Sequence, residues 1–258
     1  KESSAASDVY KRQRYKELTF EGRNAVIEAF RSGKTIDKLF ILDGCQDGPI
    51  KSIVREAKKT STIINYVDKE RLDRLANTGH HQGVVAIGAA YEYAEVEDIL
   101  EAARCKGEAP FIFVLDEIED PHNLGAIIRT ANLAGAHGVI IPKRRAVGLT
   151  ATVAKTSAGA INYTPVAKVT NIANTIEALK KEGLWFVCAD MGGETMYNLD
   201  LKGPIGLVIG NEGNGVSRLV KDKCDFIASI PMKGDIDSLN ASVAAGVLAY
   251  EIVRQRLN

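Results

Sequence analysis

The first residues that could take part in a reaction come shortly after the apolar segment 111–115. There the sequence reads Asp120-Pro-His-Asn-Leu-Gly-Ala-Ile-Ile-Arg-Thr-Ala-Asn132. Asp120 is a good N-cap and Pro121 a good first helical residue, so we predict a helix that begins at the carboxyl end of a strand, where open α/β sheets bind ligands. Helical spacing aligns four side chains on one stripe: His122, Gly125, Arg129 and Asn132. Gly125 would let a ligand or another backbone approach Arg129. A capped helix with a solvated face explains the pattern equally well.

A glycine-rich loop follows a second apolar segment, 205–209. It reads Ile209-Gly-Asn-Glu-Gly-Asn-Gly215, and its glycines allow a tight turn that could line a cofactor, with the Glu212 carboxylate at the end of the strand. The patterns GxGxxG and GxxxxGK[ST] occur nowhere in the chain, which disfavours a conventional dinucleotide or P-loop site. A plain turn before a helix is the alternative.

The third group joins a strand end, a glycine loop and a helix start. It reads Ile230-Pro-Met-Lys-Gly-Asp-Ile-Asp-Ser-Leu-Asn-Ala-Ser242. Ser238 fits an N-cap, and capping alone would explain it. Asn240 is a poor choice inside an apolar helix unless its side chain forms a hydrogen bond, so we expect it to have a partner.

Charge is balanced overall but uneven along the chain. Thirty-three basic and thirty-three acidic residues argue against nonspecific coating of nucleic acid. Ten acids lie between Glu92 and Asp120, whereas 121–176 contains none and six cations: Arg129, Lys143, Arg144, Arg145, Lys155 and Lys168. If that window folds as one unit, a positive surface for phosphates can form there. Chance clustering on a solvated face is the alternative.

Metal, disulfide and membrane chemistry are disfavoured. The four cysteines form no CxxC pair, His80 and His81 have no ligand-type residue at metal spacing, and no apolar run approaches the roughly 18 residues of a membrane span. The polar start of the sequence does not resemble a secretory signal. We therefore expect no metal, reduced thiols, a surface loop around the histidines and a cytoplasmic location.

The elements that must position these residues alternate between strand and helix. At about 150 residues per domain, the 258 residues suggest one large or two medium domains. We predict a flexible basic arm over 1–17, a small α/β domain over 18–90, an acidic linker with one exposed helix over 91–109, and a larger α/β domain over 110–258. Short apolar strands separated by helices predict a mostly parallel sheet in the larger domain, with Trp185 in its core and a last helix over 238–257.

Taken in order and spacing, the three groups resemble the signature motifs of the SpoU (TrmH) RNA 2′-O-ribose methyltransferases, within the SPOUT class. The matching residues are Asn123-x-Gly-x-x-x-Arg129, Gly210-Asn-Glu212-Gly-x-Gly, and Ile230-Pro-Met with Ser238-Leu-Asn240-x-Ser242. Segments 22–28 and 79–85 resemble the start and end of the substrate-binding domain in the RlmB-like branch, which acts on 23S ribosomal RNA. Ala241 stands where many members carry valine.

The resemblance implies a SPOUT-type sheet with a C-terminal trefoil knot, preceded by a domain similar to ribosomal protein L30e. It also implies a homodimer formed through the C-terminal domain, with S-adenosylmethionine bound in the knot. The implied cofactor contacts are Gly210, Ile230 and Leu239. The implied catalytic set is Asn123, Arg129, Glu212, Ser238 and Asn240.

The expected activity is therefore methylation of a guanosine ribose in 23S rRNA. A tRNA ribose methyltransferase of the same family and a non-catalytic RNA-binding protein are the alternatives. Since a guanidinium is a poor base, we expect Arg129 to bind phosphate and stabilise the reacting oxygen, with a phosphate or Glu212 accepting the proton. Asn123 and Ser238 would then orient Arg129 and the ribose, while Asn240 and Glu212 brace the loops.

Overall fold

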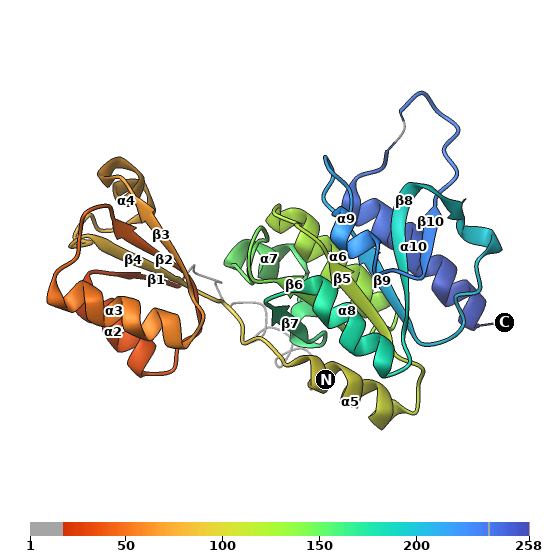
Figure 1. Cartoon of the computed structure of the whole chain (residues 1–258), viewed down its shortest axis with the longest axis horizontal. Helices are drawn as coiled ribbons and strands as arrows, with labels where there is room; N and C mark the ends of the chain where they lie inside the picture. Colours follow the sequence, from red (N-terminus) through yellow and green to blue (C-terminus); the bar gives the residue numbers. More distant parts are fainter. Residues whose placement is uncertain (1–17, 237, 258) are drawn as a thin grey trace, which may run out of the picture. The chain divides into compact units, whose positions relative to one another are not determined.

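The computed structural model describes residues 18–236 and 238–257 as two compact units (Figure 1). The small unit comprises the described residues up to Glu92 together with Leu149–Ala151, and the larger unit comprises Tyr93–Gly148 and the described residues from Thr152 onward. The predicted basic arm, 1–17, lies outside the described residues.

The small unit is a mixed four-stranded sheet in the order β1-β4-β2-β3. Its strands are β1 Leu18–Glu21, β2 Ile36–Leu42, β3 Ile63–Val67 and β4 Val84–Gly88, and its helices are α2 Arg23–Arg31, α3 Gly48–Lys59 and α4 Lys69–Leu75. Alternate residues of β2 divide between the two faces: Leu39 packs with α2 and α3, whereas Phe40 packs with α4. Helices α2 and α3 therefore cover one face of the sheet and α4 the other.

The larger unit is a parallel six-stranded sheet in the order β10-β8-β9-β5-β6-β7. Its strands are β5 Phe111–Leu115, β6 Gly138–Pro142, β7 Val166–Val169, β8 Trp185–Thr195, β9 Ile205–Ile209 and β10 Phe226–Ser229. Its helices are α5 Val96–Lys106, α6 Pro121–Leu133, α7 Ala151–Thr156, α8 Ile172–Lys181, α9 Arg218–Lys221 and α10 Ala241–Arg256, with short 3-10 turns η1 Ala160–Asn162 and η2 Met196–Asn198. The continuous apolar segments β5 and β9 are buried along their whole length, as the prediction of a covered parallel sheet requires.

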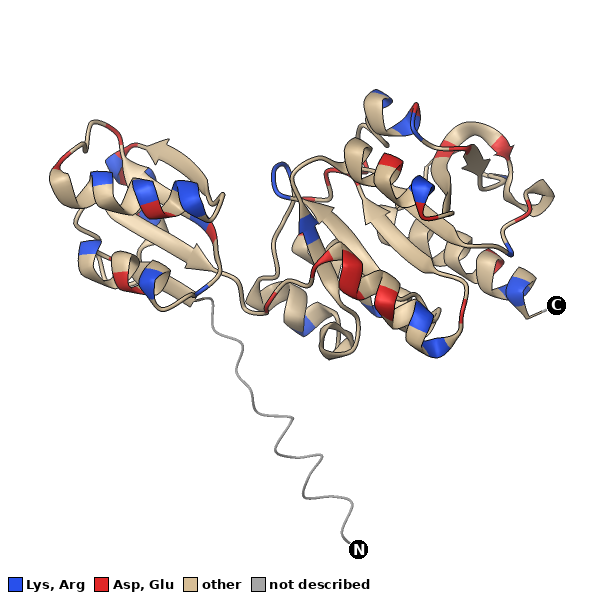
Figure 2. Ribbon diagram, turned by 60° about the horizontal axis from the view of Figure 1, so that its bottom comes forward, with Lys and Arg blue, Asp and Glu red and all other residues tan. Residues whose placement is uncertain are grey.

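Two expectations about packing were wrong. The acidic segment 91–109 is not a linker with an exposed helix, because α5 buries Ile99 and Leu100 in the core of the larger unit. Its first turn is acidic and its last turn basic, as Figure 2 shows, so the charges complement the helix dipole. Trp185 is 54% exposed and stacks on Phe226 instead of lying in the core. In the described part of the chain, no helix is both long and apolar enough to cross a membrane.

Helix α6 begins as predicted and is held firmly in the larger unit. The Asp120 side chain accepts a hydrogen bond from the His122 backbone N–H at 3.0 Å. Gly125 serves the packing of a neighbouring helix, since a Cβ atom there would lie 2.8 Å from Thr156 Cβ and 2.9 Å from the Val153 carbonyl of α7. Of the two possibilities for Gly125, the approach of another backbone is therefore the one observed.

The C-terminal helix α10 is fastened to the connection between β8 and β9. The Gln255 amide donates to the Leu199 carbonyl at 3.0 Å and accepts from the Leu201 N–H at 2.8 Å. Arg256 donates to the Gly203 carbonyl at 2.7 Å. These bonds satisfy polar groups at the buried end of the helix. The trefoil knot itself stays a prediction.

Candidate active site

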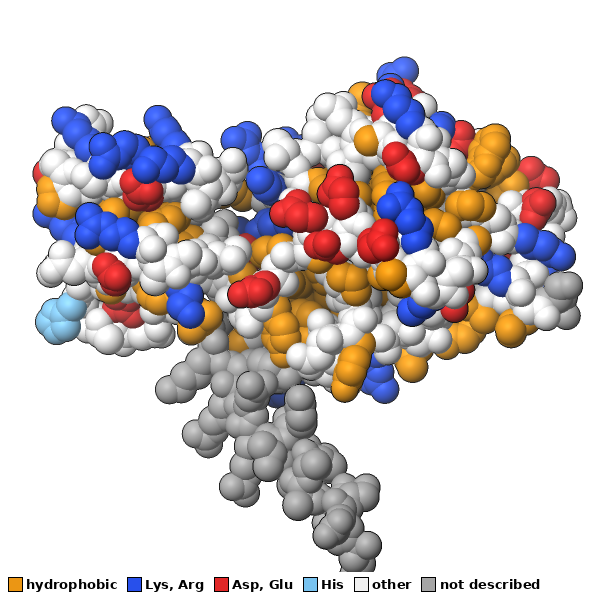
Figure 3. Space-filling model, turned by 90° about the horizontal axis from the view of Figure 1, so that it is seen from below, with side chains coloured by type: hydrophobic (Ala, Val, Ile, Leu, Met, Phe, Trp, Pro, Cys, Tyr) orange, Lys and Arg blue, Asp and Glu red, His pale blue; other side chains and the backbone are white. Residues whose placement is uncertain are grey.

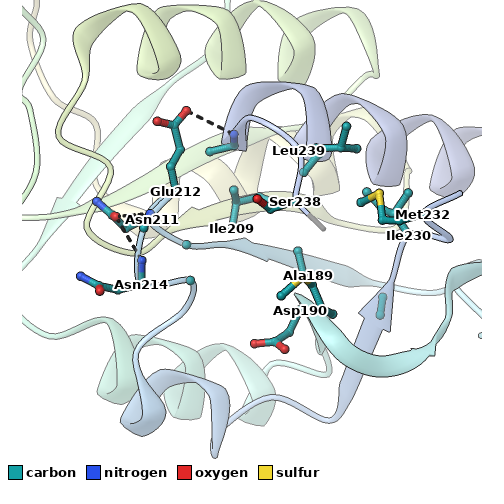
Figure 4. Close-up of a pocket in the computed structure, with 17 residues that line it drawn as sticks. Ala189, Asp190, Ile209, Asn211, Glu212, Asn214, Ile230, Met232, Ser238 and Leu239 are labelled. Atoms are coloured by element: carbon teal, nitrogen blue, oxygen red, sulfur yellow. Dashed lines mark hydrogen bonds between the residues drawn. The ribbon is translucent and has the colours of Figure 1, made fainter. Parts of the chain in front are cut away.

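A cavity of about 390 Å³ lies beside the middle of β8 and the carboxyl ends of β9 and β10 (Figure 4). The three residues expected to contact a cofactor, Gly210, Ile230 and Leu239, all line it. Glu212 and Ser238 line it as well. Five of the eight predicted site residues, from the second and third motifs, therefore share one cavity.

The glycine-rich loop closes on itself beneath this cavity. Asn211 and Gly215 exchange backbone hydrogen bonds of 3.0 and 2.8 Å, and the Asn211 side chain accepts from the Gly213 N–H at 2.8 Å. A Cβ atom on Gly210 would lie 2.2 Å from the Gly215 carbonyl carbon, so only glycine fits there. From this turn the Glu212 carboxylate points toward the start of α10 (Figure 4).

Glu212 joins the three motifs through one carboxylate oxygen. Its Oε1 accepts from Asn123 Nδ2 at 2.7 Å, from Asn240 Nδ2, and from the Ala241 backbone N–H at 3.4 Å. Asn240 Nδ2 also donates to Asn123 Oδ1 at 3.0 Å. Within residues 18–236 and 238–257, no partner contacts Glu212 Oε2, which leaves that oxygen able to accept a further hydrogen bond.

Asn240, and not Ser238, is the N-cap of α10. Asn240 Oδ1 accepts from the Ser242 N–H at 2.9 Å and from the Val243 N–H at 3.3 Å, so the helix begins at Ala241 rather than at 238 as predicted. The expectation that Asn240 has a partner is confirmed. Ser238 precedes the cap and lines the cavity, which frees its hydroxyl for a ligand.

Arg129 lies outside the hydrogen-bonded cluster. It is exposed on α6, six residues after Asn123, and it has no hydrogen bond or ion pair with any described residue. A structural Arg129 would pair with an acid such as Asp116 or Glu119, but among the described residues neither forms an ion pair with it, and the Asp116 carboxylate accepts from the Ser217 N–H at 2.8 Å. Arg129 is thus an exposed cation without a structural partner in the described chain.

The six cations of the acid-free window do not form one uniform positive surface. Arg145 pairs with Glu117 at 2.9 Å, and Lys168 lies over the Tyr93 ring at 4.7 Å. Two of the six are therefore engaged within the larger unit. Arg129 and Arg144 are exposed, so they still present positive charge to solvent as the sequence predicts.

One cavity residue, Asp190, escaped the sequence analysis. Asp190 follows the buried part of β8, lines the cavity and forms an ion pair with Lys221 of α9. The hydrogen bond from Lys221 holds the pKa of the Asp190 carboxyl below its usual value. The signal was present, because an acid at the carboxyl end of an apolar parallel strand is the pattern that drew attention to Glu212.

The paired histidines of the small unit do not form a metal centre. His81 is buried, bonding Asp73 at 2.8 Å through Nε2 and the Gly83 N–H at 3.0 Å through Nδ1, while His80 is exposed. The expected surface loop is therefore right for His80 and wrong for His81. No three His, Cys, Asp or Glu side chains of the described residues are grouped to hold a metal ion.

Comparison with known proteins matches both units. A model of the SpoU rRNA Methylase family matches residues 110–250, and a model of RNA 2′-O ribose methyltransferase substrate binding matches residues 20–94. YacO of Bacillus subtilis, assigned to the TrmH family of tRNA/rRNA methyltransferases, is 53% identical over 236 residues, which cover 91% of this chain and 94% of YacO.

Two solved structures resemble nearly the whole chain. The SpoU methyltransferase AviRb from Streptomyces viridochromogenes, in complex with the cofactor AdoMet, is 26% identical with a TM-score of 0.58, covering 93% of this chain and 91% of AviRb. An rRNA methyltransferase from Sinorhizobium meliloti is 25% identical with a TM-score of 0.57, and the match covers 96% of this chain and 91% of that enzyme.

The capping geometry predicts different effects at two neighbouring positions. Asn240→Ala removes the N-cap of α10 and two bonds to the cluster, so it should lower the free energy of unfolding by about 1 kcal/mol or more. Ser238→Ala removes neither and should leave stability unchanged. Denaturant unfolding followed by Trp185 fluorescence measures both, since the chain's single tryptophan lies in the larger unit. Equal losses in the two variants would contradict the assignment of the cap.

Proposed function

The chain belongs to the SpoU (TrmH) family of RNA 2′-O-ribose methyltransferases, and we propose that it methylates a guanosine ribose in 23S ribosomal RNA with S-adenosylmethionine as donor. The observation that carries the proposal is the position of Glu212, which lines the cavity and also accepts the bonds of Asn123 and Asn240. A cofactor cavity and a polar cluster are thus adjacent. Because DNA lacks a 2′-hydroxyl, this chemistry requires RNA.

The cavity suits S-adenosylmethionine in size and chemistry. Its volume of about 390 Å³ falls within the usual range for small-ligand sites. Ile209, Ile230 and Leu239 offer apolar contacts to a flat base, and the Asp190 carboxylate can accept from a hydroxyl or an ammonium group. We assign Gly210 a backbone contact. The bound cofactor would supply a methyl group on a sulfonium, which becomes a neutral thioether on transfer.

Arg129 is the residue we assign to the RNA. Its guanidinium has no partner in the described chain, so its donors are available for a phosphate beside the target ribose and for the charge that develops on the 2′-oxygen. A guanidinium does not give up its proton readily, so it does not act as the base. Glu212 Oε2 is the acceptor that the chain itself offers for the hydroxyl proton.

Asn123 and Asn240 are positioning residues in this scheme. Their amides fix Glu212 Oε1, which leaves the orientation of Oε2 determined by the protein rather than by solvent. Ser238, on the cavity wall and free of the capping role, is assigned to orient the ribose. The protein therefore holds the Glu212 carboxylate in place before the RNA binds, whereas Arg129 has no partner in the described chain.

The small unit supports ribosomal RNA as substrate. It carries the match to a substrate-binding model, and the rRNA methyltransferase from Sinorhizobium meliloti is similar over both units. A tRNA substrate is the second candidate, because YacO is named as a tRNA/rRNA methyltransferase, which includes both classes of RNA. We assign RNA binding to the small unit and methyl transfer to the larger one.

Methyl transfer to defined transcripts tests the proposal. The chain is incubated with methyl-labelled S-adenosylmethionine and unmodified 23S rRNA or tRNA transcripts. We expect label in the 23S transcript at one guanosine ribose, which is mapped as a position that resists alkaline cleavage. Labelling of tRNA alone would show that tRNA, the second candidate, is the substrate. Thermal stabilisation by NAD but not by S-adenosylmethionine would refute the methyltransferase assignment.

Replacing Arg129 separates a catalytic from a structural role. Arg129→Ala should reduce single-turnover methyl transfer by a factor on the order of 10² while leaving the melting temperature and cofactor affinity unchanged. Arg129→Lys should recover little of the methyl transfer, because an ammonium group does not reproduce the planar, bidentate hydrogen bonding of a guanidinium. Lys181→Ala, which removes an exposed cation from α8, is the charge-matched control. A stable Arg129→Ala variant with wild-type turnover would remove Arg129 from the catalytic set.

We also propose a homodimer formed through α6 and α10 of the larger unit. These helices pack together, yet Leu133, Val243 and Tyr250 remain 65%, 49% and 51% exposed, which is more apolar surface than one copy covers. Light scattering should show a dimer at micromolar concentration and a monomer for Val243→Glu/Tyr250→Glu. Leu219→Glu, at another exposed apolar site, should stay dimeric. A monomeric wild-type chain would contradict the proposal.

A further inference from the structure

Helix α3 of the small unit presents a row of cations to solvent. Lys51, Arg55, Lys58 and Lys59, which we call the α3 basic face, are all exposed and line a shallow hollow of about 500 Å³ with Val54. Spacings of four and three residues keep Lys51, Arg55 and Lys58 on one side of the helix. Figure 3 shows Lys and Arg side chains gathered over α2 and α3. The row lies opposite the residues that hold the helix to the sheet, Ile50, Ile53 and Ala57.

Acids within the small unit neutralise little of this charge. Glu56 bonds Lys59 at 2.9 Å and lies 3.8 Å from Arg55. Lys51 and Lys58 have no acidic partner among the residues that the structure describes. One acid therefore faces four cations, and the remaining positive charge is open to solvent.

On the opposite face of the small unit's sheet, positive and negative charges are equal in number. Helix α4 and its cap carry three cations and three acids: Lys69, Arg71, Arg74, Asp68, Glu70 and Asp73. Arg74 lies 3.5 Å from Glu70. The excess of positive charge on α3 thus has no counterpart on α4.

The α3 basic face is unfavourable for the helix that carries it. Lys51 and Arg55, and Arg55 and Lys59, are like charges four residues apart, which destabilise a helix. Lys58 and Lys59 in the last turn are favoured by the helix dipole, but Lys51 near the first turn is not. That turn holds no acid, and the Asp47 cap before it is paired with Arg23. Helix stability alone does not explain the row, whereas an anionic partner would.

We propose that the α3 basic face is the surface through which the small unit binds the phosphate backbone of its RNA, an inference that rests on the proposed function. The cations span about 10 Å along the helix, so they can contact neighbouring phosphates of one strand. Contacts of this kind position the RNA without reading its sequence. Selection of the methylated nucleotide then stays with the larger unit.

Two triple variants with equal loss of charge test this surface in the full chain. The first variant, Lys51→Ala/Arg55→Ala/Lys58→Ala, removes three of the four cations of the α3 basic face and keeps Lys59, which pairs with Glu56. The second, Lys69→Ala/Arg71→Ala/Arg74→Ala, removes three exposed cations from α4. Filter binding to 23S rRNA and tRNA transcripts between 50 and 200 mM KCl measures the affinity and its salt dependence, and S-adenosylmethionine binding and melting temperature report the fold.

The face variant should bind RNA about tenfold or more weakly at low salt, with a slope of log K on log salt that is smaller by about 2, which corresponds to roughly 0.7 per lost phosphate contact. The α4 variant should match the wild-type chain. Exchanging the cations, as Lys51→Arg/Arg55→Lys/Lys58→Arg, should retain binding, because backbone contacts need charge and not a particular side chain.

Equal weakening in both triple variants would show an effect of net charge and overturn the inference. Unchanged binding by the face variant would do the same while leaving methyl transfer, and so the proposed function, intact. A wild-type chain that binds neither transcript would instead overturn the proposed function and this inference with it. If the triple variant fails to fold, Lys51→Ala alone, on the exposed side of the helix, should still reduce the salt slope by about 0.7.

Discussion

The arrangement of the larger unit depends on one carboxylate oxygen, Oε1 of Glu212. It accepts from Asn123 and Asn240, which stand 89 and 28 residues away along the chain. Asn123 is buried, so its amide would be costly without this acceptor. The same bonds fix the start of α10, because Asn240 is also its cap. One acceptor therefore couples the orientation of α6, the glycine loop and α10.

The parallel sheet brings these groups within reach. Strands β5 and β9 are neighbours in a register that pairs Leu115 with Ile209, so the residues after each strand meet at the same edge. The Asp116 N–H donates to the Ile209 carbonyl at 2.8 Å, and Asn211 Nδ2 donates to the Glu117 carbonyl at 3.0 Å. The loop that carries Glu212 is thus anchored to the segment that leads into α6.

Much of this architecture follows from local pattern. Strands β5 and β9 were predicted to the residue, because a fully buried parallel strand is a continuous apolar run with clear ends. The cap of α10 was misplaced at Ser238, since serine and asparagine cap equally well and the choice depends on Glu212, far along the chain. The burial of α5 and the exposure of Trp185 depend on sheet order, which no local pattern reveals. Asp190 was missed although the rule that found Glu212 applied to it.

The fastening of Gln255 to the β8–β9 connection has a consequence for synthesis. Helix α10 carries the cap of the polar cluster at one end and this amide at the other, and both contact segments made earlier. A ribosome delivers the chain from the amino terminus at about 5–20 residues per second, so β5 to β9 emerge well before the helix that completes them. The cavity and its cluster can be assembled only after Ala244, the last of the described residues that line the cavity, has emerged. The nascent chain therefore has its small unit available for folding while the site of the larger unit is still incomplete.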